Sequence, residues 1–439
     1  MAQNDWRTTT VGALCDAGIL RTQTGPFGSQ LHSHDYVAKG IPVVATEGIA
    51  RRHLRTTGMP EVSQGTAARL SRHRLQAGDI VFARRGAQAT GLSAIVTADQ
   101  EGWLCGTGAI VLRTLTAEID PEYLSFYLSE ASSMQWLKQH AVGAVMPNLN
   151  EGVIRQIPLK LPTLAEQRAI AEVLGALDNK IELNRQMNAT LEAMARSLFL
   201  SWFVDFDPVR AKMDGRGPVW MDAETAPLFP DSFEDSQLGP IPIGWQIRSL
   251  DEIAHFLNGL ALQKYPPINS ETLPVIKIAQ LRKGDVTGAD RCDRNIPKNY
   301  VVGDGDVLFS WSGSLEVELW CGGEGALNQH LFKVTSNDFP KWFYYLWTLQ
   351  HLKEFRLIAA GKATTMGHIQ RSHLAAAKVL VPPRRLLDAM TRLVSPLVDK
   401  FIANRIEART LAKLRDTLLP RLLTGELRVV YAGDPSAAV

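Results

Sequence analysis

The stretch PTLAEQRAIAEVLGALDNKIELNRQMNATLEAMARSLFLSWF, residues 162–203, decides the fold of this chain. Pro162 ends an extended run, Thr163 can accept a hydrogen bond from an amide of the first turn, and Glu166 follows three residues later. This arrangement is typical of a capping box and predicts a helix that starts at Thr163. Because nothing after Gly175 interrupts the pattern, the helix would be about 57 Å long and needs a second helix to bury its apolar face.

One face of this helix repeats at alternating steps of four and three residues, which is typical of a coiled-coil seam. The seam consists of Ile170, Leu174, Leu177, Ile181, Asn184, Asn188, Leu191, Ala195 and Leu198. A second seam lies far downstream and consists of Met390, Val394, Leu397, Phe401, Asn404, Ala408, Leu411 and Leu418. Asparagines within an apolar seam fix the register of a helix pair. We therefore predict that the two helices pair and match their polar layers.

The second helix is part of a repeat that spans the chain. LDNKIELNR at 177–185 returns as LVDKFIANR at 397–405, with its lysine, second asparagine and arginine at the same places. Upstream, GIPVVATEGI at 40–49 matches TLPVIKIAQL at 272–281, GDIVF at 78–82 matches GDVLF at 305–309, and PEYLSFYL at 121–128 matches PKWFYYLW at 340–347. We interpret the chain as an internal duplication whose first copy carries insertions only in its globular part.

Each copy begins with a globular head. Short apolar runs such as IPVVA, DIVFA, LSAIV and AIVLR, bounded by Gly and Asp, predict strands, and residues 121–140 predict one helix opened by Pro121. We predict an α+β fold, internally duplicated, with two mixed heads joined by two long helices. The predicted boundaries are 1–161 for the first head, 162–206 for the first helix, 207–244 for a linker, 245–383 for the second head, 384–427 for the second helix and 428–439 for a tail.

Positive charge is concentrated in the first head. The whole chain has a net charge of +2 and a pI near 8.3, too mild to indicate a nucleic-acid partner by itself. A cluster of arginines is nevertheless present: Arg51, Arg52, Arg55, Arg69, Arg72, Arg74, Arg84 and Arg85. Arginine suits bidentate contacts with phosphate and with guanine. We predict that the cluster binds DNA, although a charge run can also be a solvated face.

The second head has fewer cations, interrupted by aspartates. The predicted DNA-binding residues there are Lys277, Arg282, Lys283, Arg291 and Arg294, together with Ser312 and Gln329 as groups that could read base edges. Trp311 is assigned to packing. The two heads therefore present different contact surfaces, which would read different sequences.

Motifs for catalysis are missing. The chain has no GxxxxGK[ST] phosphate loop and no GxGxxG turn, and His32 and His34 lack a third metal ligand, so we expect no enzymatic activity and no metal. The four cysteines stand alone and are expected to be reduced thiols. No signal pattern and no apolar run of about 18 residues is present, so we expect a cytoplasmic chain that does not bind membranes.

Two heads, each followed by a long helix, with LPTLAEQRAI at 161–170 and LDNKIELNR beyond it, resemble the specificity subunit of type I restriction-modification systems. The segments WFVDFDPVRAKMDG at 202–215, LGPIPIGWQIRSLDEIA at 238–254 and LLTGEL at 422–427 are also similar to segments of that family. The resemblance covers nearly the whole chain.

The resemblance implies that each head is a target recognition domain that reads one half of a split DNA sequence. The helices would pair antiparallel, set the gap between the halves and dock two methyltransferase subunits. Those subunits would carry S-adenosylmethionine, and motor or endonuclease subunits using ATP and Mg²⁺ could join. Two alternatives stay open: a non-catalytic coiled-coil adaptor, or the recognition part of another DNA adenine methyltransferase system.

The second helix departs from the first in two ways. Pro396 stands where the first helix has Ala176, and a proline inside a helix removes a hydrogen bond and clashes with the preceding turn. We therefore expect the second helix to bend there or to begin only after Ser395. The EQR signature at 166–168 is also absent from the second copy, which predicts asymmetric partner contacts at that end.

Overall fold

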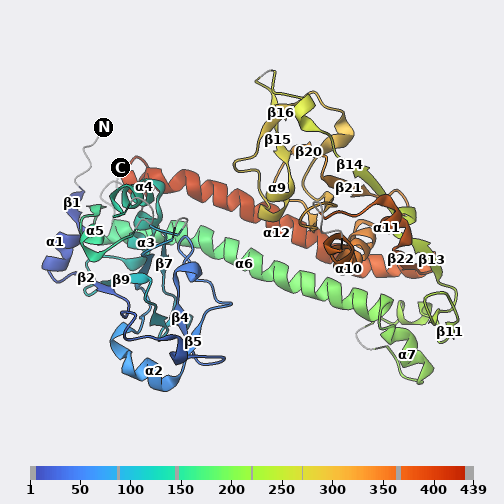
Figure 1. The fold of residues 1–439 in the computed structure, drawn as a ribbon, viewed down its shortest axis with the longest axis horizontal. Coiled ribbons are helices and arrows are strands. Elements are labelled where there is room, and N and C mark those ends of the chain that lie inside the picture. Colours follow the sequence, from blue (N-terminus) through green and yellow to red (C-terminus); the bar gives the residue numbers. More distant parts are fainter. Residues whose placement is uncertain are drawn as a thin grey trace. The chain divides into compact units, whose positions relative to one another are not determined.

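The computed structural model describes residues 6–86, 89–143, 148–218, 221–268, 270–361 and 367–430. The chain divides into two compact units: unit 1 comprises Met1–Asn179 with Leu411–Val439, and unit 2 comprises Lys180–Thr410. Two long helices, α6 (Leu164–Phe203) and α12 (Arg384–Thr424), contribute to both units (Figure 1). Each unit therefore holds one head and one part of the helix pair.

Unit 1 contains the first head, which is built on two four-stranded sheets. One has the strand order β2-β9-β6-β7 and is antiparallel; the other has the order β3-β5-β4-β8, in which β4 and β8 are parallel. Strands β1 and β10 pair where the chain enters and leaves the head. The elements are β1 (Arg7–Thr10), α1 (Val11–Asp16), β2 (Leu20–Thr24), η1 (Ser33–Asp35), β3 (Tyr36–Val37), β4 (Ile41–Val44), η2 (Thr46–Gly48), β5 (Glu61–Val62), α2 (Gln64–Arg69), η3 (Ser71–His73), β6 (Ile80–Ala83), β7 (Ser93–Ile95), η4 (Ala98–Gln100), β8 (Leu104–Cys105), β9 (Ala109–Thr114), α3 (Pro121–Ser129), α4 (Ala131–His140), α5 (Glu151–Arg155) and β10 (Pro158–Leu161).

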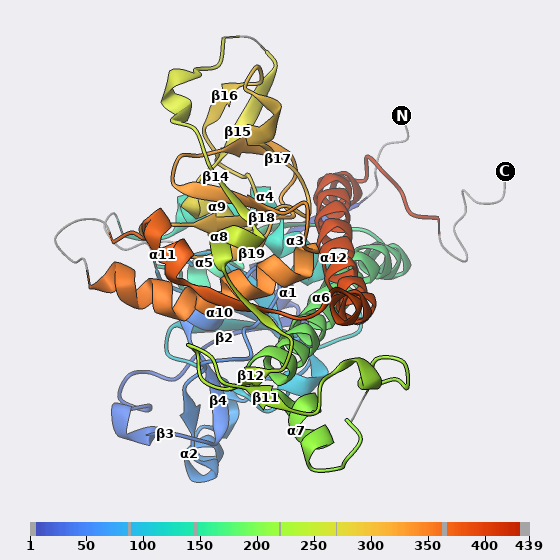
Figure 2. The ribbon, with the colours of Figure 1, turned by 90° about the vertical axis from the view of Figure 1, so that its right-hand side faces the viewer.

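Unit 2 contains the second head, whose sheets have the orders β14-β21-β18-β19 and β16-β15-β20-β17. Going outward from α10, the first sheet is followed by the second (Figure 2). The elements are α7 (Asp207–Met213), η5 (Ala226–Leu228), β11 (Phe233–Glu234), β12 (Ile241–Pro242), β13 (Gln246–Ser249), α8 (Leu250–Ile253), β14 (His255–Asn258), η6 (Leu262–Lys264), β15 (Thr272–Ile276), α9 (Ile278–Lys283), β16 (Arg291–Asp293), η7 (Lys298–Tyr300), β17 (Val301–Val302), β18 (Val307–Ser310), β19 (Val317–Leu319), β20 (Gly325–Leu327), β21 (Leu331–Thr335), α10 (Lys341–Ala360), α11 (Arg371–Ala376) and β22 (Lys378–Val381).

The two heads share one sheet order and one parallel strand pair, which confirms the α+β fold and the internal duplication. The order β2-β9-β6-β7 returns as β14-β21-β18-β19, and the parallel pair β4 and β8 returns as β15 and β20. The predicted strands IPVVA, DIVFA, LSAIV and AIVLR are β4, β6, β7 and β9. Buried apolar residues keep these strands in place; all four residues of β6 are buried.

One predicted helix of the first head is in fact two. Residues 121–140 form α3 and α4, separated by Glu130, which has extended backbone angles of φ −67° and ψ 150°. The Glu130 carboxylate accepts a hydrogen bond from the Ser132 amide at 2.6 Å and so caps α4. The equivalent α10 of the second head is one helix of 20 residues. The single-helix prediction is therefore wrong for the first copy because a local cap restarts the helix.

The segment between α6 and the second head is folded rather than irregular. Helix α7 follows Phe206, and β11 pairs with β12. Phe206, Val209, Phe229 and Ile241 are buried in the same apolar core as Trp245 of the second head. This segment is part of unit 2 and does not serve only as a spacer between domains.

In unit 1 the helix pair is joined by an ionic cluster. The side chain of Asp178 on α6 is only 5% exposed and accepts hydrogen bonds from Arg52 Nε at 3.0 Å and from Arg415 Nη1 of α12 at 2.7 Å. Burial lowers the pKa of Arg415, but Asp178 and then Asp416 more than offset this and raise it above its ordinary value. Around the cluster, Ile170, Leu174, Leu419, Leu422 and Leu423 are buried in the core of the first head, while Leu177, Leu411 and Leu418 are half-buried.

In unit 2 the helices share a polar layer. The Asn404 amide nitrogen donates to Asn188 Oδ1 at 3.0 Å, and Asn184 donates to Glu407 at 2.8 Å. Contacts run from Asn184 with Glu407 to Asn188 with Asn404, so the helices are antiparallel here. Asn184, Asn188, Asn404 and Val398 are buried, whereas Ile181, Leu191, Leu198, Leu397 and Phe401 are half-buried.

The second long helix begins well before its internal proline. Helix α12 begins at Arg384 and continues through Pro396 to Thr424, so the expectation that it begins only after Ser395 is wrong. Its first turns are buried in the core of unit 2: Leu386, Leu387, Met390 and Val394 are each at most 2% exposed. Burial of such side chains stabilises by about 1.5–3 kcal/mol each, which offsets the roughly 3 kcal/mol cost of an interior proline.

Removing the buried carboxylate tests the ionic cluster. The variant Asp178→Ala leaves the buried Arg52 guanidinium with Glu122 as its remaining acidic partner. We expect a loss of about 3–5 kcal/mol in the free energy of unfolding. Asp416, which is half-exposed and also pairs with Arg415 at 2.8 Å, provides the matched control. Asp416→Ala should cost at most about 1 kcal/mol. Equal losses for the two variants in urea denaturation would contradict a special role for Asp178.

Candidate nucleic-acid interface

The two heads hold a loop cluster at the same place in their folds. In unit 1 the chain leaving β6 runs beside the turn that enters β9, since the Arg84 amide donates to the Gly108 carbonyl oxygen at 2.9 Å. In unit 2 the chain leaving β18 meets the turn that enters β21 in the same way, since the Trp311 amide donates to the His330 carbonyl oxygen at 3.3 Å. These two turns therefore occupy equivalent positions.

A third segment closes both clusters. The Leu149 amide donates to the Arg84 carbonyl oxygen at 2.7 Å, and the Ile369 amide donates to the Trp311 carbonyl oxygen at 2.9 Å. The residues can therefore be compared position by position. Site 1 consists of Arg84, Arg85, Gly106, Thr107 and Gly108 with the adjacent Thr46 and Glu47, and site 2 consists of Trp311, Ser312, Asn328, Gln329 and His330 with the adjacent Asn258.

Site 1 is hollow partly because its floor carries glycines, at Gly106 and Gly108. A Cβ atom on Gly108 would lie 2.3 Å from Thr46 Oγ1, so a larger residue would displace the Thr46 side chain. Above this floor lies a cavity of about 420 Å³, and the exposed side chains of Arg85 and Glu47 line it. Neither side chain has a hydrogen-bond or ion-pair partner among the described residues. An unpaired cation and an unpaired carboxylate are thus available to one ligand.

Site 2 is filled by a chain of hydrogen bonds. Gln329 Nε2 lies 3.3 Å from His330 Nε2, and His330 Nδ1 lies 2.9 Å from Ser312 Oγ. Since the amide nitrogen of Gln329 can only donate, His330 accepts through Nε2 and donates through Nδ1 to the buried Ser312. Trp311 Nε1 donates to Asn258 Oδ1 at 2.9 Å. The hydrogen bonds orient the Gln329 amide, and among the described residues its second N–H and its oxygen have no partner.

The predicted arginines of the first head have different surroundings. Arg55, Arg72 and Arg85 are exposed and form no ion pair among the described residues. The others have partners: Arg51 Nε donates to the Ser129 carbonyl oxygen at 2.9 Å, Arg69 pairs with Asp35 at 2.7 Å, Arg74 donates to the Gly102 carbonyl oxygen at 3.3 Å, and Arg84 donates to Asn148 at 3.1 Å. The arginines of the sequence cluster therefore differ in how many of their donors remain for a ligand.

The prediction that Arg52 binds DNA is wrong. Its guanidinium is buried, pairs with Asp178 and with Glu122 at 2.8 Å, and lies 3.2 Å from the centroid of the Phe126 ring. Its backbone has a φ of 66°, in the left-handed region that non-glycine residues seldom adopt. The predicted cluster included Arg52 because its acidic partners, Glu122 and Asp178, are far away in the sequence.

Arg72 forms a hydrogen bond with the neighbouring His73, whose protonation state it influences. Burial, and then the charge of Arg72, lower the pKa of His73. The His73 ring is therefore neutral near pH 7, and its Nε2 accepts a hydrogen bond from Arg72 Nε at 3.1 Å. Arg72 is exposed, and among the described residues its side chain forms hydrogen bonds through Nε alone. His73 thus orients the arginine without adding charge.

In the second head most of the predicted cations are paired. Lys277 pairs with Asp290, Lys283 with Asp285 at 3.3 Å, and Arg294 with both oxygens of Glu324 at 2.7 and 2.9 Å, while Arg291 donates to Thr272 at 3.0 and 3.1 Å. Arg282, at the end of α9, is exposed and has no ion-pair partner among the described residues. Among the described residues of the predicted set in this head, hydrogen bonds connect only Ser312 and Gln329, each of which bonds to His330.

The sequence analysis missed Thr46, Glu47 and the glycine floor of site 1. Single glycines and a lone glutamate carry no signal by themselves. Aligning GDIVF with GDVLF places Arg85 opposite Ser312, and this correspondence could have indicated a shared site.

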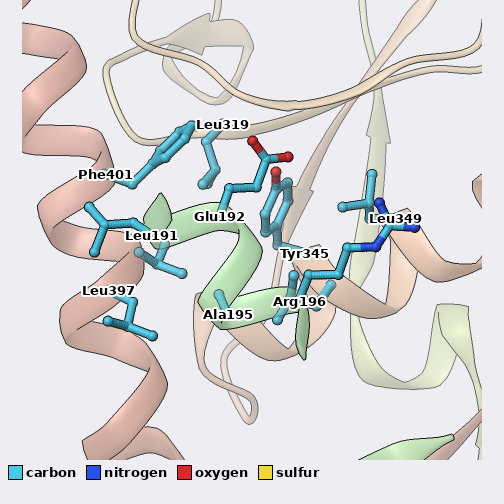
Figure 3. Close-up of a pocket in the computed structure, with 11 residues that line it drawn as sticks. Leu191, Glu192, Ala195, Arg196, Leu319, Tyr345, Leu349, Leu397 and Phe401 are labelled. Carbon is cyan, nitrogen blue, oxygen red and sulfur yellow. The ribbon is translucent and has the colours of Figure 1, made fainter. Parts of the chain in front are cut away.

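A second cavity lies in unit 2 among α6, α10, α12 and β19, but it is small. It has a volume of about 20 Å³, enough for roughly one water molecule, and apolar residues such as Leu191, Leu397 and Phe401 line it (Figure 3). Glu192 and Tyr345 lie next to each other at its edge (Figure 3). Burial, then Glu318 and Glu192, raise the pKa of Tyr345, so this hydroxyl stays protonated. We interpret this cavity as a gap in helix packing.

Within the described residues, no group of three or more His, Cys, Asp or Glu side chains could hold a metal ion. The rings of His32 and His34 stack 5.1 Å apart. No helix among those residues is long and apolar enough to cross a membrane.

Comparisons with known proteins agree with the duplicated architecture. The family described as "Type I restriction modification DNA specificity domain" matches residues 4–193 and again 242–404. The chain is 26% identical to the type I restriction enzyme MjaIX specificity subunit of Methanocaldococcus jannaschii, over 70% of this chain and 69% of that protein. It is 25% identical to the type I restriction enzyme HindI specificity subunit of Haemophilus influenzae, over 80% of this chain and 87% of that protein.

The fold is similar to the crystal structure of a type I restriction-modification S subunit from M. genitalium, with a TM-score of 0.57 and 15% identity over 98% of both chains. One family match falls on each copy of the repeat, and together the two matches cover most of the sequence. The chain therefore belongs to the family of type I restriction-modification DNA specificity domains.

Proposed function

We propose that this chain is the DNA-recognition subunit of a type I restriction-modification complex, in which each head reads one half of a split target. The observation that carries the proposal is the pairing of site 1 with site 2. Both sites have the same backbone hydrogen bonds, yet they present different polar side chains. Two readers that share a frame but differ in side chains suit a target whose halves differ in sequence.

In this proposal the chain itself carries out no chemistry and holds no cofactor. Two methyltransferase subunits dock on the helices and supply S-adenosylmethionine, and motor subunits that use ATP and Mg²⁺ join for cleavage. A base must leave the stack to be methylated, and the methyltransferase pocket bears that cost. The heads decide only where the complex binds.

The direct test is a methylation map. The full chain is co-expressed with a cognate methyltransferase subunit, in a host without adenine methylation, and the DNA is sequenced for N6-methyladenine. We expect one split motif with a fixed gap, which disappears when this chain is omitted. Methylation that persists without the chain, or none from a folded complex, would favour an adaptor over a specificity subunit.

Exposed arginines of the first head should bind phosphate. We expect Arg55→Ala and Arg72→Ala to weaken binding to all duplexes alike. Each phosphate that the protein no longer neutralises should shrink the log-log salt slope by about 0.9. Arg69→Ala is the matched control, because Arg69 already pairs with Asp35 at 2.7 Å and should change the slope less. If the slope stays the same for Arg55→Ala and Arg72→Ala, these residues lie outside the DNA footprint.

The helices should set the gap between the half-sites. Inserting seven residues after Asn179 in α6 and seven after Thr410 in α12 preserves the seam, because seven residues make one heptad. We expect a gap longer by about three base pairs, given roughly 1.5 Å per helical residue and 3.4 Å per base pair, with both half-sites unchanged. Methylation mapping measures the gap, and an altered half-site with an unaltered gap would argue against this role.

A further inference from the structure

We propose that site 1 reads a G·C pair through Arg85 and Glu47, and that site 2 reads an A·T pair through Gln329. This inference rests on the proposed function and names the base chemistry of each head. It follows from which donors and acceptors remain unused in each site.

In site 1 the unused groups match both bases of one G·C pair. The Arg85 guanidinium presents parallel N–H donors, which suit O6 and N7 of guanine. The Glu47 carboxylate lines the same cavity and presents only acceptors, which suit the N4 amino group of cytosine. An A·T pair would leave the carboxylate opposite thymine O4 or its methyl group, with nothing to accept from thymine.

In site 2 the unused groups match adenine. The Gln329 amide gives one N–H to His330, and in the part of the chain that the structure describes its second N–H and its oxygen have no partner. One donor beside one acceptor fits the N7 acceptor and the N6 amino donor of adenine in the major groove. Guanine offers two acceptors there and would leave the amide oxygen facing O6. Ser312 and His330 act as positioning residues, because they hold the amide in this orientation.

The two sites place their reading side chain on different segments of the same frame. In site 1 the long side chain comes from the loop after β6, and the floor at Gly108 is bare. In site 2 the loop carries the small, buried Ser312, and the floor carries Gln329 and His330. An ideal Cβ on Gly108 would lie 3.7 Å from Arg85 Nε, so the guanidinium occupies the space above that position. The shared frame of each site therefore carries one long reading group, and in site 1 Glu47 adds a second group from the adjacent η2 turn.

The experiment compares methylation maps of complexes that contain the wild-type chain, Arg85→Ala or Gln329→Ala. We expect Arg85→Ala to lose preference, by about 5- to 150-fold, at one G·C position of one half-site. Gln329→Ala should lose a similar preference at one A·T position of the other half-site. Relaxation in neither half, in the same half for both variants, or at the wrong kind of base pair would overturn the inference.

Arg55→Ala provides the matched control, since Arg55 is also an exposed arginine of the first head without an ion-pair partner among the described residues. It should lower binding to all duplexes and reduce the salt slope, without relaxing any position. Arg85→Ala should relax one position and change the slope less. If Arg85→Ala behaves like Arg55→Ala, then Arg85 binds phosphate and the assignment of site 1 fails.

A variant that changes the preferred base, instead of losing all preference, separates an effect on recognition from an effect on folding. In Gln329→Glu the side chain keeps its shape but presents only acceptors, which favour the N4 amino group of cytosine. We expect the preference at that position to move from adenine to cytosine, with a fixed gap and an unchanged second half-site. A wild-type map without any split motif would refute the proposed function itself. A split motif that keeps adenine in Gln329→Glu refutes only the present inference.

Discussion

A single buried carboxylate, Asp178, holds the first head on the helices of unit 1. Moving a charge out of water costs several kcal/mol, so Asp178 is tolerable only because Arg52 and Arg415 both bond to it. Arg52 comes from the head and Arg415 from α12, so one side chain fixes three segments. In unit 2, α12 supplies the arginines: Arg405 bonds to Glu318 at 3.2 Å and Arg409 bonds to Asp304 at 2.7 Å. Arg409 thereby lowers the pKa of Asp304.

Among the described residues, the ion pairs between heads and helices do not involve the side chains of site 1 and site 2, so these side chains can differ between the two heads. The bonds among Arg84, Gly108 and Leu149, and among Trp311, His330 and Ile369, use only backbone atoms. Backbone bonds of this kind place no demand on the side chains at the same positions. The frame of each site therefore persists whether the floor carries glycine or histidine. A duplicated head can thus acquire a new reading surface without a change in its sheets.

The sequence predicted what depends on regular spacing. The seams of α6 and α12, the repeat and the strands of the heads all have a period that local residues reveal. Prediction from the sequence failed where a residue far away in the sequence determines the local structure. Arg52 looked like part of a basic cluster, yet its carboxylate partner is Asp178, in a helix after the head. Pro396 suggested a helix start, but burial of Leu386 and Met390 outweighs the proline. The glycine floor of site 1 has no periodic signal at all.

The contrast between the sites also explains why counting charges was a poor guide to recognition. Three of the five cations predicted to bind DNA in the second head, Lys277, Lys283 and Arg294, are bonded to acids, and such pairs have few donors left for a ligand. What distinguishes a reading group is an unused donor or acceptor held at a fixed place, as for Arg85 and Gln329. Such a donor or acceptor is held in place by neighbouring side chains that are hydrogen-bonded to each other, such as Ser312 and His330. If Arg85 and Gln329 read bases as we propose, specificity depends on a few polar atoms that have no partner among the described residues, held by neighbours that are paired.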